Sequence, residues 1–498
     1  MKDERRNRKL SRRAMLRASL TGTGAVLLAA CGNPPASSDG GVTAASTAGS
    51  SAASTAASAA PSTAAAASAS PSALSLPAGA AGKLTVIHRT EYFEGVQNKF
   101  RDLVTQFAAS KGTELDISTA NPEAFGDFNA KMQAAVQAGT PPDLAYHTLS
   151  IPQLHFLDIL EDVTDVVEEA RQKYGEIVPA TAEKNAQIDG KWWAVPFMSN
   201  TGAWFARKDA FEAAGVDLSK LTDYNSYRDA ALKVSDPSKE MWGWGLTINK
   251  SGDGHGLITH VIQSFGGRFV DQTGQKVTFN SPETVQAVTW LKETYTGDTY
   301  KKMLPPGIES WTDVSNNESY LAGKIALTNN AFTVYTKAKK DNNPVFGNTA
   351  VLQVPVANDG TRLVSGANGW FTIFKGAKNV DLAKQAILHM LDPKNFMSMV
   401  TEGGGLFLPA YKNLWTDDVL KLDPNFATLQ EIIFNPTAYT GQAFPANPNA
   451  AIAGIDAQAI LSQMMANVNN GSMTPEQAVE DAHNKMVQIF EELGLPQS

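Results

Sequence analysis

The sequence predicts an α/β fold of two lobes, in which sheets with parallel cores are flanked by helices. Three observations lead to this prediction. The chain has 498 residues, which is too long for one ordinary domain. From residue 84 onward, apolar residues alternate between the period of strands and the period of helices. A later passage rich in aromatic and branched residues, 188–209, is typical of strands that cross between lobes.

The first thirty residues form a predicted export signal and not part of the fold. A basic head is followed by a short apolar run from Leu20 to Ala30, which is too short to anchor stably in a bilayer. The run Ser11–Arg17 resembles the twin-arginine signal, and Leu28–Cys31 resembles a lipobox, so Cys31 is the predicted lipidation site. The alternative interpretation is an ordinary basic start with a chance cysteine.

Cys31 is the only cysteine in the chain. If Cys31 is lipidated, the exported protein has no thiol, which excludes disulfides, thiolate metal sites and cysteine nucleophiles. Residues 31–82 are almost entirely Ala, Ser, Thr, Gly and Pro. Such a composition buries too little apolar surface to fold, so this segment is predicted to be a disordered linker.

Charge argues against a nucleic-acid partner. The whole chain carries a net charge of −8, and its first thirty residues contribute eight basic and two acidic side chains, so the remainder carries −14. A surface of that sign repels phosphate backbones. No other stretch has the continuous apolar length of a transmembrane helix.

The first elements of the fold follow a β-α-β-α-β order. Strands are predicted at 84–88, 115–118 and 144–147, with helices over 96–107 and 125–136 between them. This order predicts a parallel sheet with helices on both faces. Ligands of such sheets bind at loops after the strand C-termini, which here are Glu91–Tyr92 and His147–Ser150.

The passage 188–209 is predicted to be the first crossing between the lobes. Asp189 and Gly190 make a tight turn, and the residues after it form two short extended segments, broken at Pro196 and Gly202. A further strand passage is predicted at 363–374, and helices after Ser281, over 381–391 and after Thr474. A third crossing is expected at 406–409.

The order of these motifs resembles the extracellular solute-binding proteins of family 1, the maltose-binding-like components of ABC importers. The resemblance rests on Pro142-Asp143 before a short strand, Asp189-Gly190-Lys191, Gly323-Lys324-Ile325, Gly369-Trp370-Phe371 and Thr474-Pro475-Glu476, and it covers roughly 410 residues. It implies a two-lobe periplasmic-binding-protein-like fold of type II with three hinge crossings. The lobes implied are 83–199 with 370–410, and 200–369 with 411–498.

The resemblance also implies a function. The protein is expected to be a non-enzymatic, monomeric solute-binding protein without a cofactor, lipid-anchored outside the cytoplasm. It would capture a solute between its lobes and deliver it to a membrane permease. Carbohydrate is the favoured solute, because 9 Trp, 11 Tyr and 22 Phe offer rings for the apolar faces of sugars.

Ten residues are predicted to contact the solute. Matching to the family's motifs implicates seven of them, although a histidine such as His147 also suits a hydrogen-bonded position at a strand end. A Gly-rich loop at 251–256 and a tryptophan in a loop add the other three. The full set is Glu91, Tyr92, His147, Asn200, Asp253, His255, Trp311, Asn330, Phe332 and Trp370.

Two other classes of function stay open. An exported glycan-acting enzyme would use two carboxylates at a set separation, and 50 acidic residues do not exclude such a pair. A binding protein for an oxyanion or metal complex would use clustered Tyr or Arg, and no such cluster is evident. His255 and His260 lack a metal-binding spacing, and the Gly-rich loop lacks the Lys-Ser or Lys-Thr of a phosphate loop.

Overall fold

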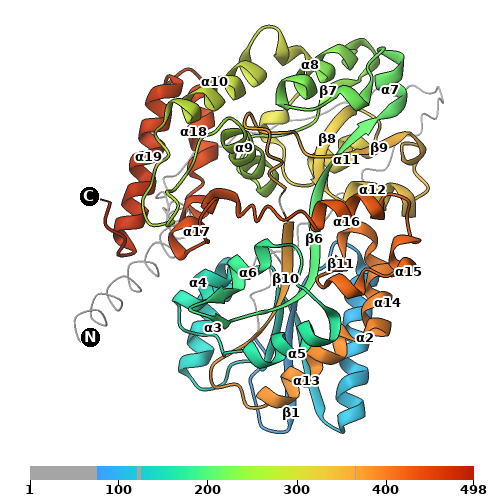
Figure 1. Ribbon diagram of the computed structural model, residues 1–498, viewed down its shortest axis with the longest axis vertical. Helices are drawn as coiled ribbons and strands as arrows, with labels where there is room; N and C mark the ends of the chain where they lie inside the picture. Colours follow the sequence, from blue (N-terminus) through green and yellow to red (C-terminus); the bar gives the residue numbers. More distant parts are fainter. Residues whose placement is uncertain (1–75, 121–124, 365, 498) are drawn as a thin grey trace, which may run out of the picture.

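The computed structural model describes residues 76–120, 125–364 and 366–497 (Figure 1). The predicted export signal, Cys31 and most of the predicted linker lie outside the described residues, so those interpretations remain predictions. The described chain forms two bodies, one above the other in Figure 1, with β6 and β10 running between them. We refer to them as the lower lobe, around β1 to β3, and the upper lobe, around α8 to α10 and α17 to α19.

The strands form one mixed sheet that extends through both lobes, in the order β2-β1-β3-β10-β6-β8-β7, and a small hairpin β4-β5. The predicted parallel core is present, since β1 pairs in parallel with β2 and with β3. Two further strands, β9 and β11, pair with β6. The strands are β1 (Lys83–Arg89), β2 (Glu114–Ala120), β3 (Leu144–His147), β4 (Gln187–Ile188), β5 (Lys191–Trp192), β6 (Val195–Arg207), β7 (Trp242–Trp244), β8 (Ile325–Ala331), β9 (Thr349–Leu352), β10 (Gly366–Ile373) and β11 (Leu408–Pro409).

Helices cover this sheet, and those predicted from the sequence are present. Ser281 caps α10, and Thr474 forms a capping box with Gln477 at the start of α19. The helices are α2 (Glu94–Lys111), α3 (Phe125–Gln137), α4 (Ile151–Phe156), α5 (Thr164–Tyr174), α6 (Thr181–Ala186), α7 (Lys208–Ala213), α8 (Tyr224–Val234), α9 (Gly252–Ser264), α10 (Pro282–Thr296), α11 (Ser315–Leu321), α12 (Thr333–Lys340), α13 (Val380–Leu391), α14 (Pro393–Gly403), α15 (Asp417–Leu420), α16 (Phe426–Ile433), α17 (Ala450–Ala457), α18 (Ile460–Asn469) and α19 (Pro475–Glu492).

Strand β6 is the structural link between the lobes. Its first half pairs with β10 and β11, and its second half pairs with β8 and β9. The prediction of two segments broken at Pro196 and Gly202 is therefore wrong. Pro196 is the second residue of the strand, beside a register shift in β10, and Gly202 continues the pairing opposite Ala331. The turn prediction is confirmed, because Asp189 and Gly190 adopt φ values of 54° and 76° between β4 and β5.

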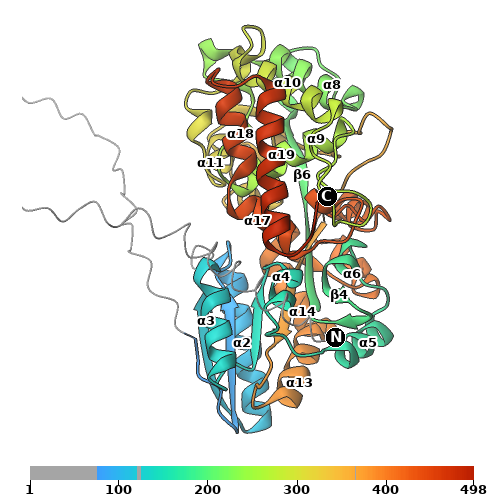
Figure 2. The same ribbon diagram turned by 90° about the vertical axis from the view of Figure 1, so that its left-hand side faces the viewer.

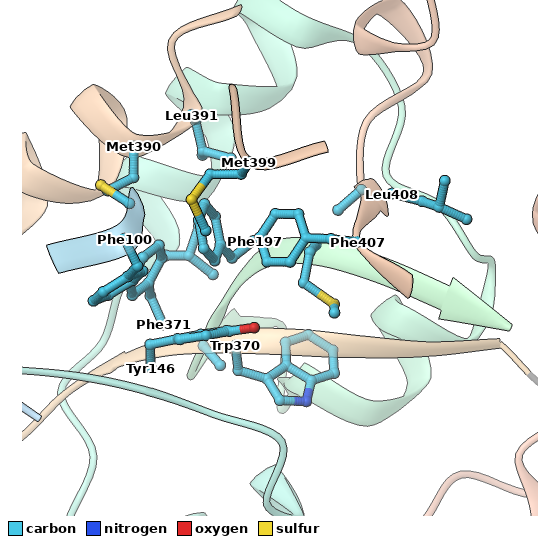
Figure 3. Close-up of a cluster of buried hydrophobic side chains, with 14 of the residues drawn as sticks. Phe100, Tyr146, Phe197, Trp370, Phe371, Met390, Leu391, Met399, Phe407 and Leu408 are labelled. Atoms are coloured by element: carbon cyan, nitrogen blue, oxygen red, sulfur yellow. The ribbon is translucent and has the colours of Figure 1, made fainter. Parts of the chain in front are cut away.

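The apolar core consists mainly of two large clusters. The first fills the lower lobe and continues along β6, and Figure 3 shows its aromatic centre. There the rings of Phe197 and Phe371 lie 4.4 Å apart, and Tyr146 packs against Phe197 at 5.2 Å. The second cluster fills the upper lobe, where α17, α18 and α19 line one side (Figure 2). Within the described chain, no helix has the length and apolarity needed to cross a bilayer.

Candidate functional site

A cavity of about 750 Å³ opens in the upper lobe, next to the second half of β6. Its wall comes from β6, α8, α9, β8 and the chain segment 439–456. The lining combines aromatic rings with amides, hydroxyls and carboxylates. Its residues are Gly202, Trp204, Tyr224, Lys250, Ser251, Gly252, Asp253, His255, Gly256, Leu257, Thr259, His260, Asn329, Asn330, Ala331, Val354, Tyr439, Thr440, Gly441, Gln442, Ile452 and Asp456.

Strand β6 places Trp204 in the cavity wall. Alternate residues of a strand share a face, so Gly202 and Trp204 both reach the cavity from the same side of β6. The indole is held from behind by aromatic rings, with Tyr227 at 4.9 Å and Trp244 at 5.7 Å between ring centroids. Trp204 is only 2% exposed, so it is a rigid part of the wall.

His260 and two tyrosines continue the aromatic wall. The Tyr224 hydroxyl donates to Nδ1 of His260 at 2.7 Å, and Nε2–H of His260 donates to the carbonyl of Leu363 at 2.7 Å. These bonds fix one neutral tautomer, and burial lowers the pKa of His260 to about 4. Tyr439 packs edge-on against the imidazole. A neutral, fully bonded histidine of this kind orients its neighbours and is not a metal ligand.

The Gly-rich sequence 251–256 is the first turn of α9, and the prediction that it forms a loop is wrong. Ser251 caps the helix by accepting a hydrogen bond from the amide of Gly254. Asp313 accepts from the amides of Gly252 and Asp253, at 3.2 and 2.8 Å. Partners for three amides of the first turn allow the helix to begin here despite its glycines.

Asp253 projects from this turn into a cluster of amides. Its Oδ2 accepts from Nδ2 of Asn316 at 2.9 Å and from Nδ2 of Asn330 at 3.3 Å. Asn330 Nδ2 also reaches Oδ1 of Asn316, and Thr333 donates to Oδ1 of Asn330. Burial raises the pKa of Asp253 to about 7, and the nearby charge of Asp313 acts in the same direction.

A second carboxylate, Asp456 on α17, lies in the same cavity. It accepts from Nδ1 of His255 at 2.9 Å and from Nε2 of Gln442 at 2.7 Å. The other imidazole nitrogen of His255 is 3.1 Å from the Ser462 hydroxyl. The Asp456 side chain is 56% exposed, so its remaining acceptor capacity faces solvent. The two carboxylates are thus held by separate networks.

Four of the ten predicted contacts lie at or beside this cavity. Asp253, His255 and Asn330 line it. Asn200 does not line it, but it lies on the same face of β6 as Gly202 and Trp204, two positions before Gly202. The structure therefore brings these predicted residues together.

His147 and Trp370 belong to the lower-lobe core. They sit opposite each other where β3 pairs with β10, and they are 1% and 5% exposed. The His147 imidazole is bonded to the Thr372 hydroxyl and to the amide of Leu149. Burial lowers the pKa of His147 to about 3, so it is neutral. Core packing accounts for both residues, and neither reaches the cavity.

Phe332 and Trp311 are also outside the cavity. Phe332 is fully buried, with its ring 5.5 Å from Phe205 and 4.8 Å from Tyr335. Trp311 is half-buried between the two core clusters, and its carbonyl accepts from Asn249. Neither aromatic ring is placed where it would stack on a solute in the cavity.

Glu91 and Tyr92 follow β1 in the lower lobe. The Glu91 side chain is buried, with Oε1 3.5 Å from Nε of Arg89. Burial raises the pKa of Glu91, while the charge of Arg89 and the Tyr146 hydroxyl oppose that shift. Tyr92 is 41% exposed and lies within the electrostatic reach of Lys337 on α12. Neither residue of this loop lines the cavity.

Several lining residues were not predicted. Trp204 lies in the first crossing, four residues after Asn200, and the alternation of side chains along this strand is the signal that could have identified it. Tyr439 and Gln442 lie in an irregular segment around the short η9 turn (Gly441–Ala443), where no periodic pattern exists. Asn316 does not line the cavity, but it bonds to two residues that do, Asp253 and Asn330, and this role has no local sequence signal.

The described residues contain no group of three or more His, Cys, Asp or Glu arranged to hold a metal ion. The rigid aromatic wall and the polar groups around it suit a small polar molecule. Together with the two-lobed α/β fold, the cavity defines a binding protein for a small solute.

Comparison with known proteins gives the family. The model of the bacterial extracellular solute-binding protein family matches residues 102–428, more than half of the chain. The chain belongs to this family, whose members bind solutes and are not enzymes. Family membership also places the protein outside the cytoplasm.

Individual relatives are distant. A mannitol-binding protein of Pseudomonas aeruginosa is 20% identical over 421 residues, covering 80% of this chain and 86% of that protein. A probable ABC transporter-binding protein of Deinococcus radiodurans is 22% identical, over 53% of this chain and 63% of its own length, which is less than two thirds. The maltose-bound MalE3 of T. maritima shares the fold, with a TM-score of 0.67 at 19% identity, covering 81% of this chain and 98% of that chain.

Proposed function

We propose that this protein captures a carbohydrate or polyol outside the cytoplasm and delivers it to the permease of an ABC importer. The observation that carries the proposal is the cavity, where the rings of Trp204, Tyr224 and Tyr439 share one wall with amides and carboxylates. Sugars combine apolar C–H faces with many hydroxyls, and they need both kinds of surface at once.

Polar groups of the cavity are placed to bind hydroxyls. Asp253 and Asp456 supply carboxylate oxygens, each held by a separate hydrogen-bond network. Asn329, Asn330 and Gln442 supply side-chain amides. Networks that are already bonded within the protein hold these groups in position before the solute arrives, which reduces the entropic cost of binding. The relatives that bind mannitol and maltose support the same class of solute.

A thermal-shift screen of the purified protein against sugars, polyols, amino acids and oxyanions tests the proposal. A specific ligand at 100 times its Kd should stabilise the fold by about 2.7 kcal/mol, because it binds only the folded state. We expect a concentration-dependent rise in Tm with one family of saccharides or polyols. A rise with an oxyanion or amino acid alone would contradict the proposed solute class.

We also propose that Cys31 carries a lipid anchor and that residues 31–82 tether the folded lobes to the membrane. The twin-arginine-like head and the lipobox-like sequence before Cys31 support this proposal. Replacing Cys31 by Ser should move the protein from the membrane fraction to the soluble extracytoplasmic fraction of expressing cells. Equal membrane association of both forms would rule the anchor out.

A further inference from the structure

The side-chain amides of Asn329 and Asn330 and the hydroxyl of Thr440, all on the cavity wall, donate to groups within the protein. Asn329 donates through Nδ2 to the carbonyl of Ala203 at 3.1 Å, and the Thr440 hydroxyl donates to the carbonyl of Ala446 at 2.8 Å. The amide of Asn330 is likewise bonded, as described above. A ligand therefore finds few donors on these side chains.

Two hydrogen-bond acceptor atoms of residues on the same wall have no partner among the described residues. Oε1 of Gln442 is buried and accepts no hydrogen bond among the described residues, although its side-chain nitrogen is bonded to Asp456. Gln442 is 7% exposed and lines the cavity. Oδ1 of Asp253 also accepts no hydrogen bond from the described residues, because both amide bonds go to Oδ2. An unpartnered buried acceptor is costly, and a bound donor removes that cost.

The charge of Asp253 is not balanced by the protein. None of the ion pairs formed by the described residues includes Asp253. Its charged neighbour is Asp313, which has the same sign and accepts from the backbone amide of Asp253. Lys250 also lines the cavity, but it is exposed and makes no ion pair with Asp253. The second carboxylate of the cavity, Asp456, is bonded to His255.

We propose that the solute carries a cationic amino group, whose ammonium pairs with Asp253 in the cavity that Gln442 also lines. The proposal rests on the proposed function and narrows it to amino sugars, amino polyols or related amine-bearing saccharides. An ammonium group has three donors and no acceptor, which complements unpartnered acceptors better than a hydroxyl does. The rings of Trp204, Tyr224 and Tyr439 also attract cations, and the negative net charge of the chain favours their approach.

Calorimetric titration with matched saccharides tests this proposal. Each probe set consists of an amino sugar, its neutral parent and its N-acetyl form, for example glucosamine, glucose and N-acetylglucosamine, extended to disaccharides and amino polyols. At a pH of 7.5 the amine-bearing member is expected to bind at least about 10-fold more tightly than the other two, because only it carries the charge. Equal or tighter binding of the neutral members would overturn the inference and leave the carbohydrate function standing.

Two variants locate the effect. Asp253→Asn keeps the side-chain shape and an acceptor but removes the charge, so it should reduce affinity for the amine-bearing probe at least about 10-fold more than affinity for the neutral probe. The control is Asp298→Asn, which removes the same charge from a side chain that is 95% exposed and does not line the cavity. Equal losses for amine and neutral probes in Asp253→Asn would contradict charge pairing.

A salt titration of the unmodified protein gives an independent answer if Asp253→Asn does not fold. Screening should weaken binding of the amine-bearing probe as ionic strength rises, while binding of the neutral parent stays nearly constant. Identical salt dependence of the two probes would overturn the inference. Absence of binding by both amine-bearing and neutral saccharides would overturn the proposed function together with it.

Discussion

Replacing Asp143 by Ala is expected to lower the free energy of unfolding by about 3 to 5 kcal/mol. Asp143 is fully buried and its carboxylate joins the start of β1 to the turn after β10. It accepts from the amide and hydroxyl of Thr85 and from the amides of Lys378 and Asn379, all within 3.0 Å. The side-chain amide of Asn379 donates as well. Removal of this acceptor leaves buried donors without partners.

Urea unfolding of the purified variants measures this effect. Asp481→Ala is the control, because the ion pair of Asp481 among the described residues is a partly exposed (i, i+4) pair with Lys485 on α19, and its loss should cost less than about 1 kcal/mol. A similar loss in both variants would show that Asp143 does not organise the lower lobe. The fold would then depend on its apolar core alone.

Replacing Trp204 by Leu is expected to weaken binding of the solute about 30-fold, or about 2 kcal/mol. Trp204 contributes a rigid ring to the cavity wall, held in place by Tyr227 and Trp244. Leucine keeps part of the apolar volume but offers no flat face to the C–H groups of a sugar ring. Calorimetric titration with the saccharide identified by thermal shift gives the Kd.

Trp244→Leu separates binding from packing. Trp244 is fully buried behind Trp204 and does not line the cavity. Both substitutions remove a buried indole, so each should destabilise the fold by about 2 to 3 kcal/mol. Only Trp204→Leu should lower the affinity of the folded protein. Equal losses of affinity in the two variants would indicate that Trp204 affects solute binding only by stabilising the fold.

Local patterns were sufficient to predict most elements of the fold. The β-α-β-α-β start, the turn at Asp189-Gly190 and the cap at Thr474 each depend on a few neighbouring residues, and all are present. The break predicted at Gly202 is absent because both edges of β6 are paired there or nearby. Pairing with distant strands overrides a local breaker, and sequence patterns do not show which strands will pair.

The candidate site was less predictable. Asp253 and His255 could be selected because they lie in a short Gly-rich stretch, and Asn330 because it follows a motif of the family that the chain resembles. His147 and Trp370 were selected by the same resemblance, yet the pairing of β3 with β10 places both in the core. Tyr439 and Gln442 enter the cavity from an irregular segment, so only the folded chain brings them to α9. The boundaries predicted for the two lobes remain predictions.

The shared strand β6 connects the fold to the proposed function. One half of this strand organises the lower lobe, and the other half carries Gly202 and Trp204 to the cavity. Asn200 lies between these halves, where a change in the angle between lobes would move it relative to the cavity. A solute bound against Trp204 therefore contacts the strand that connects the two lobes, and its binding can change the angle between them.

A crystal structure of the protein with the saccharide that gives the largest thermal shift tests the central claim most directly. We expect the ligand to lie in the upper-lobe cavity, with a ring face against Trp204 and polar groups within hydrogen-bonding distance of Asp253 and Gln442. A ligand found only at the strand ends of the lower lobe, or only on the outer surface, would contradict this account of solute binding.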